Sequence, residues 1–534
     1  MDLLPTKGGS IYMKLVRTGA ALVSLLGLAC SVTFGQASPT PAEPVSPARQ
    51  AQDCKVLAGM KVEAGTVQSA EIYSAGQTIK GGETAGAKVS TSVCRVRLRL
   101  QPTPGSDINV EVWLPQRWNG KLYGIGGAGF DGGLSPGGAA ILDKAAVQGY
   151  ASVATDVGHK PAPTLQTWVH GQPERVVDFG HRGNHLAAVV AKQVVVTHYG
   201  EPARRAYFLA CSNGGRDGLM AASRYPEDYD GIVAGAPARR YLEVLTLLIW
   251  YHQAVHGPGG APKLESKLGL VNDTVLKKCD ALDGVKDGVL ENPLRCNFDP
   301  AELQCKEGDS ANCLTSAEVE ALRKIYGGPR LSNGEQIYSG PVPGSEVAPA
   351  GWTAWITSPQ VAVYGQEFYR WIVYDDPKWT VEDFDIDRDY RAARERIAPI
   401  INAEDPDISA FARRGGKLIM YQGWYDPAIT PADTIRYYEE MRRRLGPDAD
   451  DHVRLFMVPG MGHCAGGPGA TQFDMQPVLE NWVEQGEAPD RVIAVKPDSG
   501  NPPLSRPLCP WPKTASYDGS GSTADAANFA CKVP

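Results

Sequence analysis

One serine of the chain lies where a reactive nucleophile would be expected. Ser212 follows an apolar run at 207–210 and precedes helix-forming residues at 217–223. Small residues flank it, with Gly214 behind it and Ala210 in place of the usual first glycine. A nucleophile elbow needs such residues because its strained strand-to-helix turn leaves no room for bulk. Similar pentapeptides also occur in ordinary strand-to-helix loops, so the serine needs partners elsewhere in the chain.

An acid and a base follow later in the chain. Asp426 comes after the apolar segment 417–420, and His463 comes after the apolar segment 453–458. Both side chains would therefore lie just past strand ends. The order Ser, Asp, His is the one found in α/β-hydrolases. A serine needs a base within hydrogen-bond reach, and the base needs a carboxylate to orient it. The pattern predicts Ser212 as nucleophile, His463 as base and Asp426 as the acid.

The segments around these residues have the pattern of an α/β core. Alternating apolar and polar side chains at 95–115 predict antiparallel strands at one edge of a sheet. Further strands are expected at 121–125 and 149–157, and a helix at 181–196 leads into the strand before the serine. A glycine-rich loop at 126–130 stands where this fold places one amide of its oxyanion hole. Such a loop can also cradle a phosphate, but no Gly-Lys-Ser/Thr follows.

The alternation of strands and helices stops after Pro237 and returns only at Lys417. The stretch between them carries an aromatic cluster at 364–374 and many turns, which is typical of a lid that shapes a pocket and excludes water. We therefore predict an α/β fold, an α/β-hydrolase core with a large inserted lid domain. The predicted boundaries are 51–237 and 411–534 for the two parts of the core and 238–410 for the lid.

Four motifs together resemble the tannase and feruloyl esterase family, which includes mono(2-hydroxyethyl) terephthalate hydrolase. They are Cys-Ser-Asn-Gly-Gly-Arg at 211–216, Asp-Gly-Ile-Val-Ala-Gly-Ala-Pro at 230–237, Gly-Trp-Tyr-Asp-Pro at 423–427 and Pro-Gly-Met-Gly-His-Cys-Ala-Gly-Gly-Pro-Gly at 459–469. The resemblance runs from about Cys54 to Cys531. It implies that the backbone N–H groups of Gly129 and Asn213 form the oxyanion hole.

Cysteine usage indicates an oxidising compartment. The chain has eleven cysteines, and ten remain when Cys30 of the predicted leader is set aside. Their pairing does not follow from the sequence, and Cys211 and Cys464 could also be two buried free thiols. The resemblance implies five disulfides: Cys54 with Cys94, Cys211 with Cys464, Cys279 with Cys296, Cys305 with Cys313, and Cys509 with Cys531.

An acidic loop in the predicted lid has the composition of a calcium site. Asp280, Asp283 and Asp287 stand three and four residues apart, with glycines between them that permit tight turns. The loop is not an EF-hand, because the third and fifth positions lack side-chain oxygens. The resemblance implies a structural Ca²⁺ held by these carboxylates and by the carbonyls of Val285 and Val289. The alternative is an acidic turn stapled by a disulfide. No organic cofactor is expected.

The N-terminus has the pattern of an exported protein. Residues 1–37 contain a basic region, an apolar stretch and a small-residue cleavage site, and residues 38–50 form a Pro-rich linker. The apolar stretch is too short to span a membrane. Cys30 raises the alternative of a lipoprotein anchor, although Gly27 stands where a lipobox needs leucine. We expect a secreted or periplasmic protein.

The composition of the chain limits the classes of molecule that it could bind. The 534 residues are 43% hydrophobic and 21% charged, enough for a large core. The formal net charge of −7 argues against nucleic acid or an anionic membrane as partner.

The three predicted residues indicate a serine carboxylesterase, and the family resemblance implies that it hydrolyses esters of phenolic or aromatic acids. The substrate would be a small aromatic ester, either free or attached to a plant polysaccharide or polyphenol. Alternatives are tannase activity on galloyl esters, hydrolysis of mono(2-hydroxyethyl) terephthalate, and a peptidase or lipase on the same fold. A rival from another class is a non-catalytic exported binding protein that keeps the hydrolase scaffold.

Residues that would select the substrate are harder to predict. Aromatic side chains of the lid could line a pocket or belong to the core. The candidates are Trp352, Phe368, Tyr369 and Trp371. Arg370 is a candidate partner for a free carboxylate of a terephthalate substrate. Gln422 stands where many relatives have histidine and Ile429 where the terephthalate type has phenylalanine, which argues against that substrate.

Overall fold

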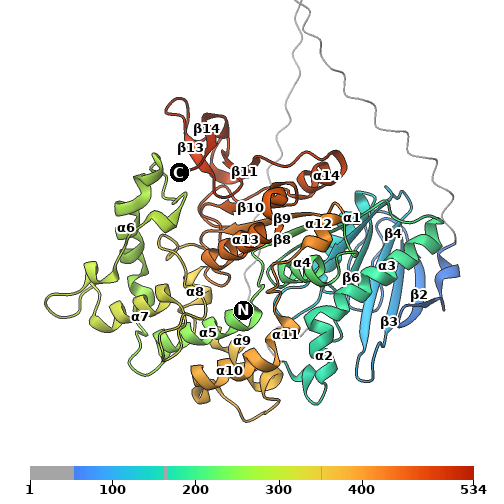
Figure 1. The fold of residues 1–534 in the computed structure, drawn as a ribbon, viewed down its shortest axis with the longest axis horizontal. Helices are drawn as coiled ribbons and strands as arrows, with labels where there is room; N and C mark the ends of the chain where they lie inside the picture. Colours follow the sequence, from blue (N-terminus) through green and yellow to red (C-terminus); the bar gives the residue numbers. More distant parts are fainter. Residues whose placement is uncertain (1–52, 161–165, 350) are drawn as a thin grey trace, which may run out of the picture. The chain divides into compact units, whose positions relative to one another are not determined.

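A ten-stranded sheet crosses the part of the chain that the structure describes (Figure 1). This computed structural model describes residues 53–160, 166–349 and 351–534, so the predicted signal peptide, linker and Cys30 lie outside it. The strand order is β1-β2-β3-β4-β6-β5-β7-β8-β9-β10. Strands β1 to β4 and the β4–β6 pair are antiparallel, whereas all pairs from β6 to β10 are parallel.

The strands of this sheet have the following bounds: β1 (Lys61–Val62), β2 (Gly65–Tyr73), β3 (Val93–Leu100), β4 (Ile108–Pro115), β5 (Lys121–Ile125), β6 (Ala151–Thr155), β7 (Arg205–Cys211), β8 (Gly231–Gly235), β9 (Lys417–Gly423) and β10 (Val453–Val458). Every strand predicted from the sequence is present. Strands β1 and β2, which extend the antiparallel edge, and the parallel strand β8 were not predicted. The parallel strands β6 and β8 are buried at every residue, which explains their continuous runs of small and apolar side chains.

Helices cover both faces of the sheet, as in an α/β-hydrolase. Alternate residues of β9 point to opposite faces, Leu418 and Met420 into one hydrophobic cluster and Ile419 into the other. The helices α3 (Gly183–Tyr199), α4 (Asn213–Arg224) and α13 (Pro431–Leu445) pack on the first face, and α1 (Pro136–Val147) and α14 (Gln476–Gln485) pack on the second. The short α2 (Pro173–Val177) and the π-helical segment η3 (Asp178–Arg182) precede α3.

A helical insertion separates β8 from β9. Its helices, coloured green to orange in Figure 1, are α5 (Tyr241–His256), α6 (Leu268–Cys279), α7 (Ser316–Gly327), α8 (Trp352–Trp355), α9 (Val361–Glu367), α10 (Ile386–Arg396), α11 (Ala398–Ile401) and α12 (Ser409–Arg413). Its hydrophobic cluster also includes Phe130 and Val157, which follow the carboxyl ends of β5 and β6. The insertion therefore packs against the edge of the sheet that carries Ser212. The domain boundaries and the role of a lid stay predictions.

The C-terminal segment forms two antiparallel hairpins. They consist of β11 (Val492–Lys496) with β12 (Leu504–Leu508) and β13 (Thr514–Tyr517) with β14 (Phe529–Lys532). The disulfide between Cys509, which directly follows β12, and Cys531 of β14 links the two hairpins.

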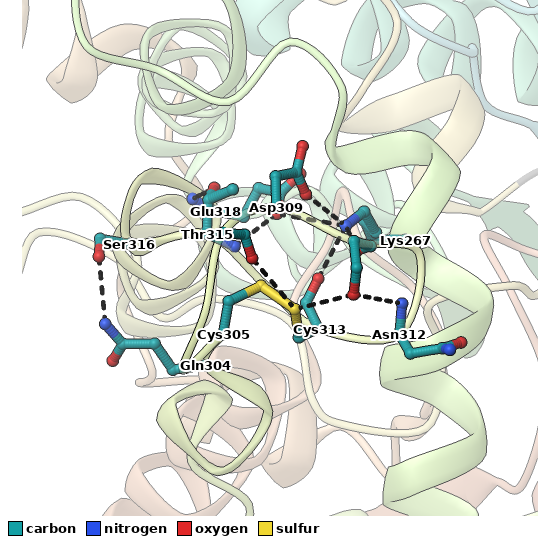
Figure 2. Close-up of a disulfide and its surroundings, with 11 residues drawn as sticks. Lys267, Gln304, Cys305, Asp309, Asn312, Cys313, Thr315, Ser316 and Glu318 are labelled. Carbon is teal, nitrogen blue, oxygen red and sulfur yellow. Dashed lines mark hydrogen bonds and ion pairs between the residues drawn. A yellow bond between two sulfur atoms is a disulfide. The ribbon is translucent and has the colours of Figure 1, made fainter.

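All five disulfides implied by the resemblance are present in the structure. Figure 2 shows the one between Cys305 and Cys313, which closes a short loop in the insertion. The amino group of buried Lys267 enters this loop and donates to the carbonyl of Cys313 at 2.7 Å and to Asp309 at 3.0 Å. A buried ammonium is tolerated here because these oxygens replace water. Five disulfides are typical of a protein of an oxidising compartment. Within the described residues, no helix is both long enough and apolar enough to cross a bilayer.

Candidate active site

Ser212 lies at the apex of a strained turn between β7 and α4. Its backbone has φ 64° and ψ −126°, a conformation that a residue with a side chain rarely adopts. Two hydrogen bonds hold it, from the Ser212 N–H to the carbonyl of Gly235 at 2.9 Å and from the Ala238 N–H to the carbonyl of Ser212 at 3.0 Å. A Cβ at Gly214 would come within 2.5 Å of the Ala210 side chain, so this position requires glycine. This geometry is that of a nucleophile elbow.

The three predicted residues meet in space. The Nε2 atom of His463 lies 2.9 Å from the hydroxyl of Ser212, and its Nδ1 atom lies 2.8 Å from Oδ2 of Asp426. Asp426 is fully buried and His463 is largely covered. The imidazole can therefore accept the hydroxyl proton at one nitrogen while the other donates to a carboxylate, as base catalysis by a triad needs.

Asp426 is held on both carboxylate oxygens. The N–H groups of Ala428 and Ile429 donate to Oδ1 at 3.0 and 2.9 Å, and the Gln422 amide reaches Oδ2 at 3.3 Å. Gln422 is itself fixed by Thr434, whose hydroxyl donates to its amide oxygen at 2.9 Å. Glutamine thus orients the acid in this chain.

The protonation of His463 depends on two opposed effects. Burial lowers the pKa of His463, but the charge of Asp426 and the hydrogen bond to it outweigh burial and raise the pKa above its usual 6.5. The imidazolium formed during proton transfer is therefore stabilised where it is needed.

A disulfide joins the segments that carry the nucleophile and the base. Cys211 and Cys464, the direct neighbours of Ser212 and His463, are bonded across 253 residues of sequence. The alternative of two free thiols is therefore wrong. Cys464 has a positive φ of 64°, so the chain turns sharply just after the histidine.

The two amides assigned to the oxyanion hole lie on segments that pack together. Asn213 is the first residue of α4, so its N–H has no partner within the helix. The loop after β5 packs against the same helix start, because a Cβ at Gly214 would also approach the Gly127 carbonyl to 2.8 Å. Within the described residues, neither the Gly129 N–H nor the Asn213 N–H donates to any acceptor. Both amides are available to a ligand.

The aromatic side chain that packs on His463, and the one that stacks on it in turn, were not among the candidates. Trp355, in α8, packs edge-on against the imidazole with ring centroids 5.4 Å apart, and Tyr364, in α9, stacks between Trp355 and Phe130 at 6.4 and 6.5 Å. Both are only partly buried. Their positions follow from how short helices of the insertion pack, for which the sequence carries no periodic signal.

Three of the four candidate aromatic residues belong to the core. Trp352, Phe368 and Tyr369 have no exposed surface and lie in the hydrophobic cluster of the insertion, so the core is the one of the two interpretations that holds for them. Trp371 is half-buried, donates to Glu367 at 2.9 Å and packs against His170.

Arg370 is already paired in this structure. Its guanidinium donates to Glu367 at 2.6 Å and to the carbonyl of Trp379 at 2.7 Å. A substrate carboxylate would have to compete with Glu367 for this charge, which argues against Arg370 as its recognition residue.

The acidic loop supplies oxygen donors that fit Ca²⁺. Asp283, Val285, Asp287 and Val289 line one small cavity of about 50 Å³. No N–H or O–H group of the described residues donates to the carbonyl oxygens of Val285 and Val289, although both residues are buried. Oxygen-only donors of this kind suit a hard cation.

The carboxylates of this loop do not converge on a common point in this structure, and several of them bond to protein groups instead. Asp280 accepts from the Gly288 N–H at 3.0 Å, and Asp287 pairs with Arg506 of β12 at 2.7 Å. Among the described residues, no group of three or more His, Cys, Asp or Glu side chains is arranged to hold a metal ion. Burial, and to a lesser degree the charge of Asp287, raise the pKa of Asp280 and Asp283. Calcium therefore stays a proposal.

Comparison with known proteins identifies the family. The pattern of "Tannase and feruloyl esterase" matches residues 93–532. An uncharacterized esterase of Xanthomonas campestris pv. campestris is 34% identical, with 90% of this chain and 91% of the relative covered. Mono(2-hydroxyethyl) terephthalate hydrolase of Piscinibacter sakaiensis is 32% identical, with coverage of 84% and 86%. The crystal structure of feruloyl esterase B from Aspergillus oryzae superposes with a TM-score of 0.80 at 27% identity, over 90% of this chain and 99% of the other. The chain therefore belongs to the tannase and feruloyl esterase family and is a carboxylic ester hydrolase with an α/β-hydrolase fold.

Proposed function

We propose that this esterase cleaves esters of phenolic or other aromatic acids through Ser212, His463 and Asp426. The observation that carries the proposal is the arrangement around one imidazole. His463 bridges the hydroxyl of Ser212 and the carboxylate of Asp426, and the ring of Trp355 packs against it. An aromatic wall beside the reacting centre favours a flat acyl group, because aromatic rings prefer offset or edge-to-face contacts with one another.

In the proposed reaction, the Ser212 oxygen attacks the ester carbonyl carbon while its proton moves to Nε2 of His463. The carbonyl oxygen becomes an oxyanion, which the N–H groups of Gly129 and Asn213 stabilise. The carbon–oxygen bond to the alcohol then breaks, and His463 returns the proton to the leaving alkoxide. Water attacks the acyl-enzyme with His463 as base, the acid is released and Ser212 regains its proton.

A panel of esters tests both parts of this proposal. Methyl ferulate, methyl gallate, mono(2-hydroxyethyl) terephthalate and p-nitrophenyl esters of aliphatic acids would be compared by kcat/KM. We expect the hydroxycinnamoyl or galloyl ester to be preferred, and Ser212→Ala to lower kcat by at least about 10³-fold. Ser223→Ala is the matched control, because this serine lies on the same helix and, among the described residues, donates to the carbonyl of Leu219 alone. Turnover that survives in Ser212→Ala would refute the nucleophile.

Among the aromatic esters, the feruloyl or galloyl class is favoured over the terephthalate. Ile429 lies where the terephthalate type has phenylalanine, and Arg370 is neutralised by Glu367. A preference for mono(2-hydroxyethyl) terephthalate in the same panel would reverse this choice.

We also propose that the loop from Asp280 to Val289 binds a structural Ca²⁺. The unpartnered carbonyls of Val285 and Val289 and the carboxylates of Asp280, Asp283 and Asp287 would hold it, and the ion would supply positive charge to a loop rich in acidic groups. The esterase reaction does not require this ion as a reactant. Export to the periplasm or the medium is proposed on the strength of the five disulfides.

A further inference from the structure

A buried ion pair lies directly beneath the elbow. Arg216, on the first turn of α4, has no exposed surface, and its guanidinium donates to Asp217 at 2.8 Å. Such a pair is costly to bury unless its remaining donors are satisfied. Here all five N–H donors of the guanidinium are used. The other acceptors are Asn213 Oδ1 at 2.7 Å and the carbonyls of Phe179, Gly180 and Ile401 at 3.2, 2.8 and 2.8 Å.

Arg216 controls one of the two amides proposed to bind the oxyanion. Its Nε atom donates to the side chain of Asn213, the residue whose backbone N–H faces the reacting centre in the proposed mechanism. The carbonyls of Gly180 and Ile401 anchor the same guanidinium to η3 and to α11. The start of α4 is thus fixed to two other segments of the chain.

Asp217 and Tyr241 control the loop that carries the other amide. The Gly127 N–H donates to Oδ2 of Asp217 at 3.3 Å, and the hydroxyl of Tyr241 donates to the carbonyl of Gly129 at 2.9 Å. Gly129 has a positive φ of 56°, and among the described residues no atom lies within 4 Å of where its Cβ would be, so at this residue the loop is not held by side-chain packing. These two hydrogen bonds hold it on either side of the amide.

Arg216 also contacts each of the other two side chains. The Arg216 guanidinium lies over the ring of Tyr241, 5.5 Å from its centroid, and both Arg216 and Asp217 come from the same helical turn. A substitution at one of them should therefore alter the positions of both amides. Oxyanion stabilisation depends on donors that are already in position before the charge develops.

We propose that Arg216, Asp217 and Tyr241 are positioning residues that hold the two peptide donors of the oxyanion hole in register with Ser212. This inference rests on the proposed function, since it presumes that Gly129 and Asn213 bind the oxyanion.

The decisive variant is Tyr241→Phe, which removes one hydroxyl and keeps the ring. We expect kcat for methyl ferulate to fall about tenfold with KM unchanged, a smaller loss than deletion of a donor itself, which costs about 10²- to 10³-fold. Tyr199→Phe is the matched control. Its hydroxyl is equally buried and also donates to one backbone carbonyl, that of Pro115, at the amino end of the parallel strands.

A second measurement separates positioning from general stability. An arylboronic acid forms a tetrahedral adduct with the serine and places an oxygen in the hole, whereas free ferulate binds without it. In Tyr241→Phe, inhibition by 4-hydroxyphenylboronic acid should weaken in parallel with kcat. Inhibition by ferulate should be as strong as in the unmodified chain, and the melting temperature should equal that of Tyr199→Phe. Asp217→Asn should weaken boronate inhibition in the same way, and if this variant does not fold, Tyr241→Phe decides alone.

The outcomes separate this inference from the proposed function. An inactive Ser212→Ala together with an unchanged kcat and boronate affinity in Tyr241→Phe would overturn the positioning role alone. Equal losses of kcat in Tyr241→Phe and Tyr199→Phe would also overturn it. An active Ser212→Ala would overturn both proposals.

Discussion

At the scale of single residues, catalysis depends on the protonation of His463. This side chain must be neutral to accept the proton of Ser212. Because Asp426 raises the pKa of His463 above 6.5 in spite of burial, the protonated, inactive form persists to higher pH than for a free imidazole.

We therefore expect kcat/KM for methyl ferulate to fall as pH drops through a value above 6.5, by about tenfold per pH unit below it. In Asp426→Asn the raising charge is absent and burial remains, so the inflection should move to lower pH. The same variant should lower kcat by about 10⁴-fold, because the tautomer is no longer held. A pH–rate profile of both proteins checks this, and an inflection that does not move would contradict the role of Asp426.

At the scale of elements, the elbow needs close contact between β7, α4 and the glycine-rich loop. A methyl group at Gly214 would lie 2.5 Å from the Ala210 side chain and 2.8 Å from the Gly127 carbonyl. We expect Gly214→Ala to destabilise the fold by about 1–3 kcal/mol and to abolish turnover.

The matched control for this variant is Gly269→Ala, in α6. Nothing lies within 4 Å of a Cβ at Gly269, and its φ is not positive. This substitution should raise the free energy of unfolding by about 0.4–1 kcal/mol, because alanine favours helix and has less freedom in the unfolded chain. Urea denaturation of both variants tests the pair, and destabilisation of equal size would count against the packing argument.

The acidic loop is a second element with a measurable consequence. If Asp280 to Val289 holds Ca²⁺, free calcium at a hundred times its Kd should raise the free energy of unfolding by about 2.7 kcal/mol. Chelation should lower the melting temperature, and Asp283→Asn should remove that response. Asp273→Asn, an exposed acid on α6 outside the loop, should keep it. A melting temperature that chelation leaves unchanged in the unmodified chain would speak against the site.

At the scale of the whole molecule, two disulfides that close loops of very different length should contribute differently to the free energy of unfolding. The Cys211–Cys464 bond spans 253 residues and the Cys305–Cys313 bond spans 8. Loop-closure entropy assigns them about 5.5 and about 2.5 kcal/mol. We expect Cys211→Ser/Cys464→Ser to lose the greater stability and also esterase activity, because the bonded residues adjoin Ser212 and His463. Cys305→Ser/Cys313→Ser should stay active. Comparable activity in the two double variants would show that the long-range bond does not position the site.

The sequence by itself determined the chemistry and the strands that present it. Ser212, Asp426 and His463 could be predicted because each follows an apolar run, and strand ends are a local property of the chain. Strands β5, β6, β7, β9 and β10 could be predicted for the same reason.

Only the tertiary structure decided what surrounds these groups. Trp355 and Tyr364 border the site while Trp352 and Tyr369 are buried, although all four are aromatic residues of one insertion. The hydrogen bonds from Arg216 to Ile401 and from Tyr241 to Gly129 span 185 and 112 residues. Which side of a short helix faces inward, and which distant segments meet, depends on the packing of the entire core. Local sequence patterns carry no information about such contacts, because they record periodicity along one segment only.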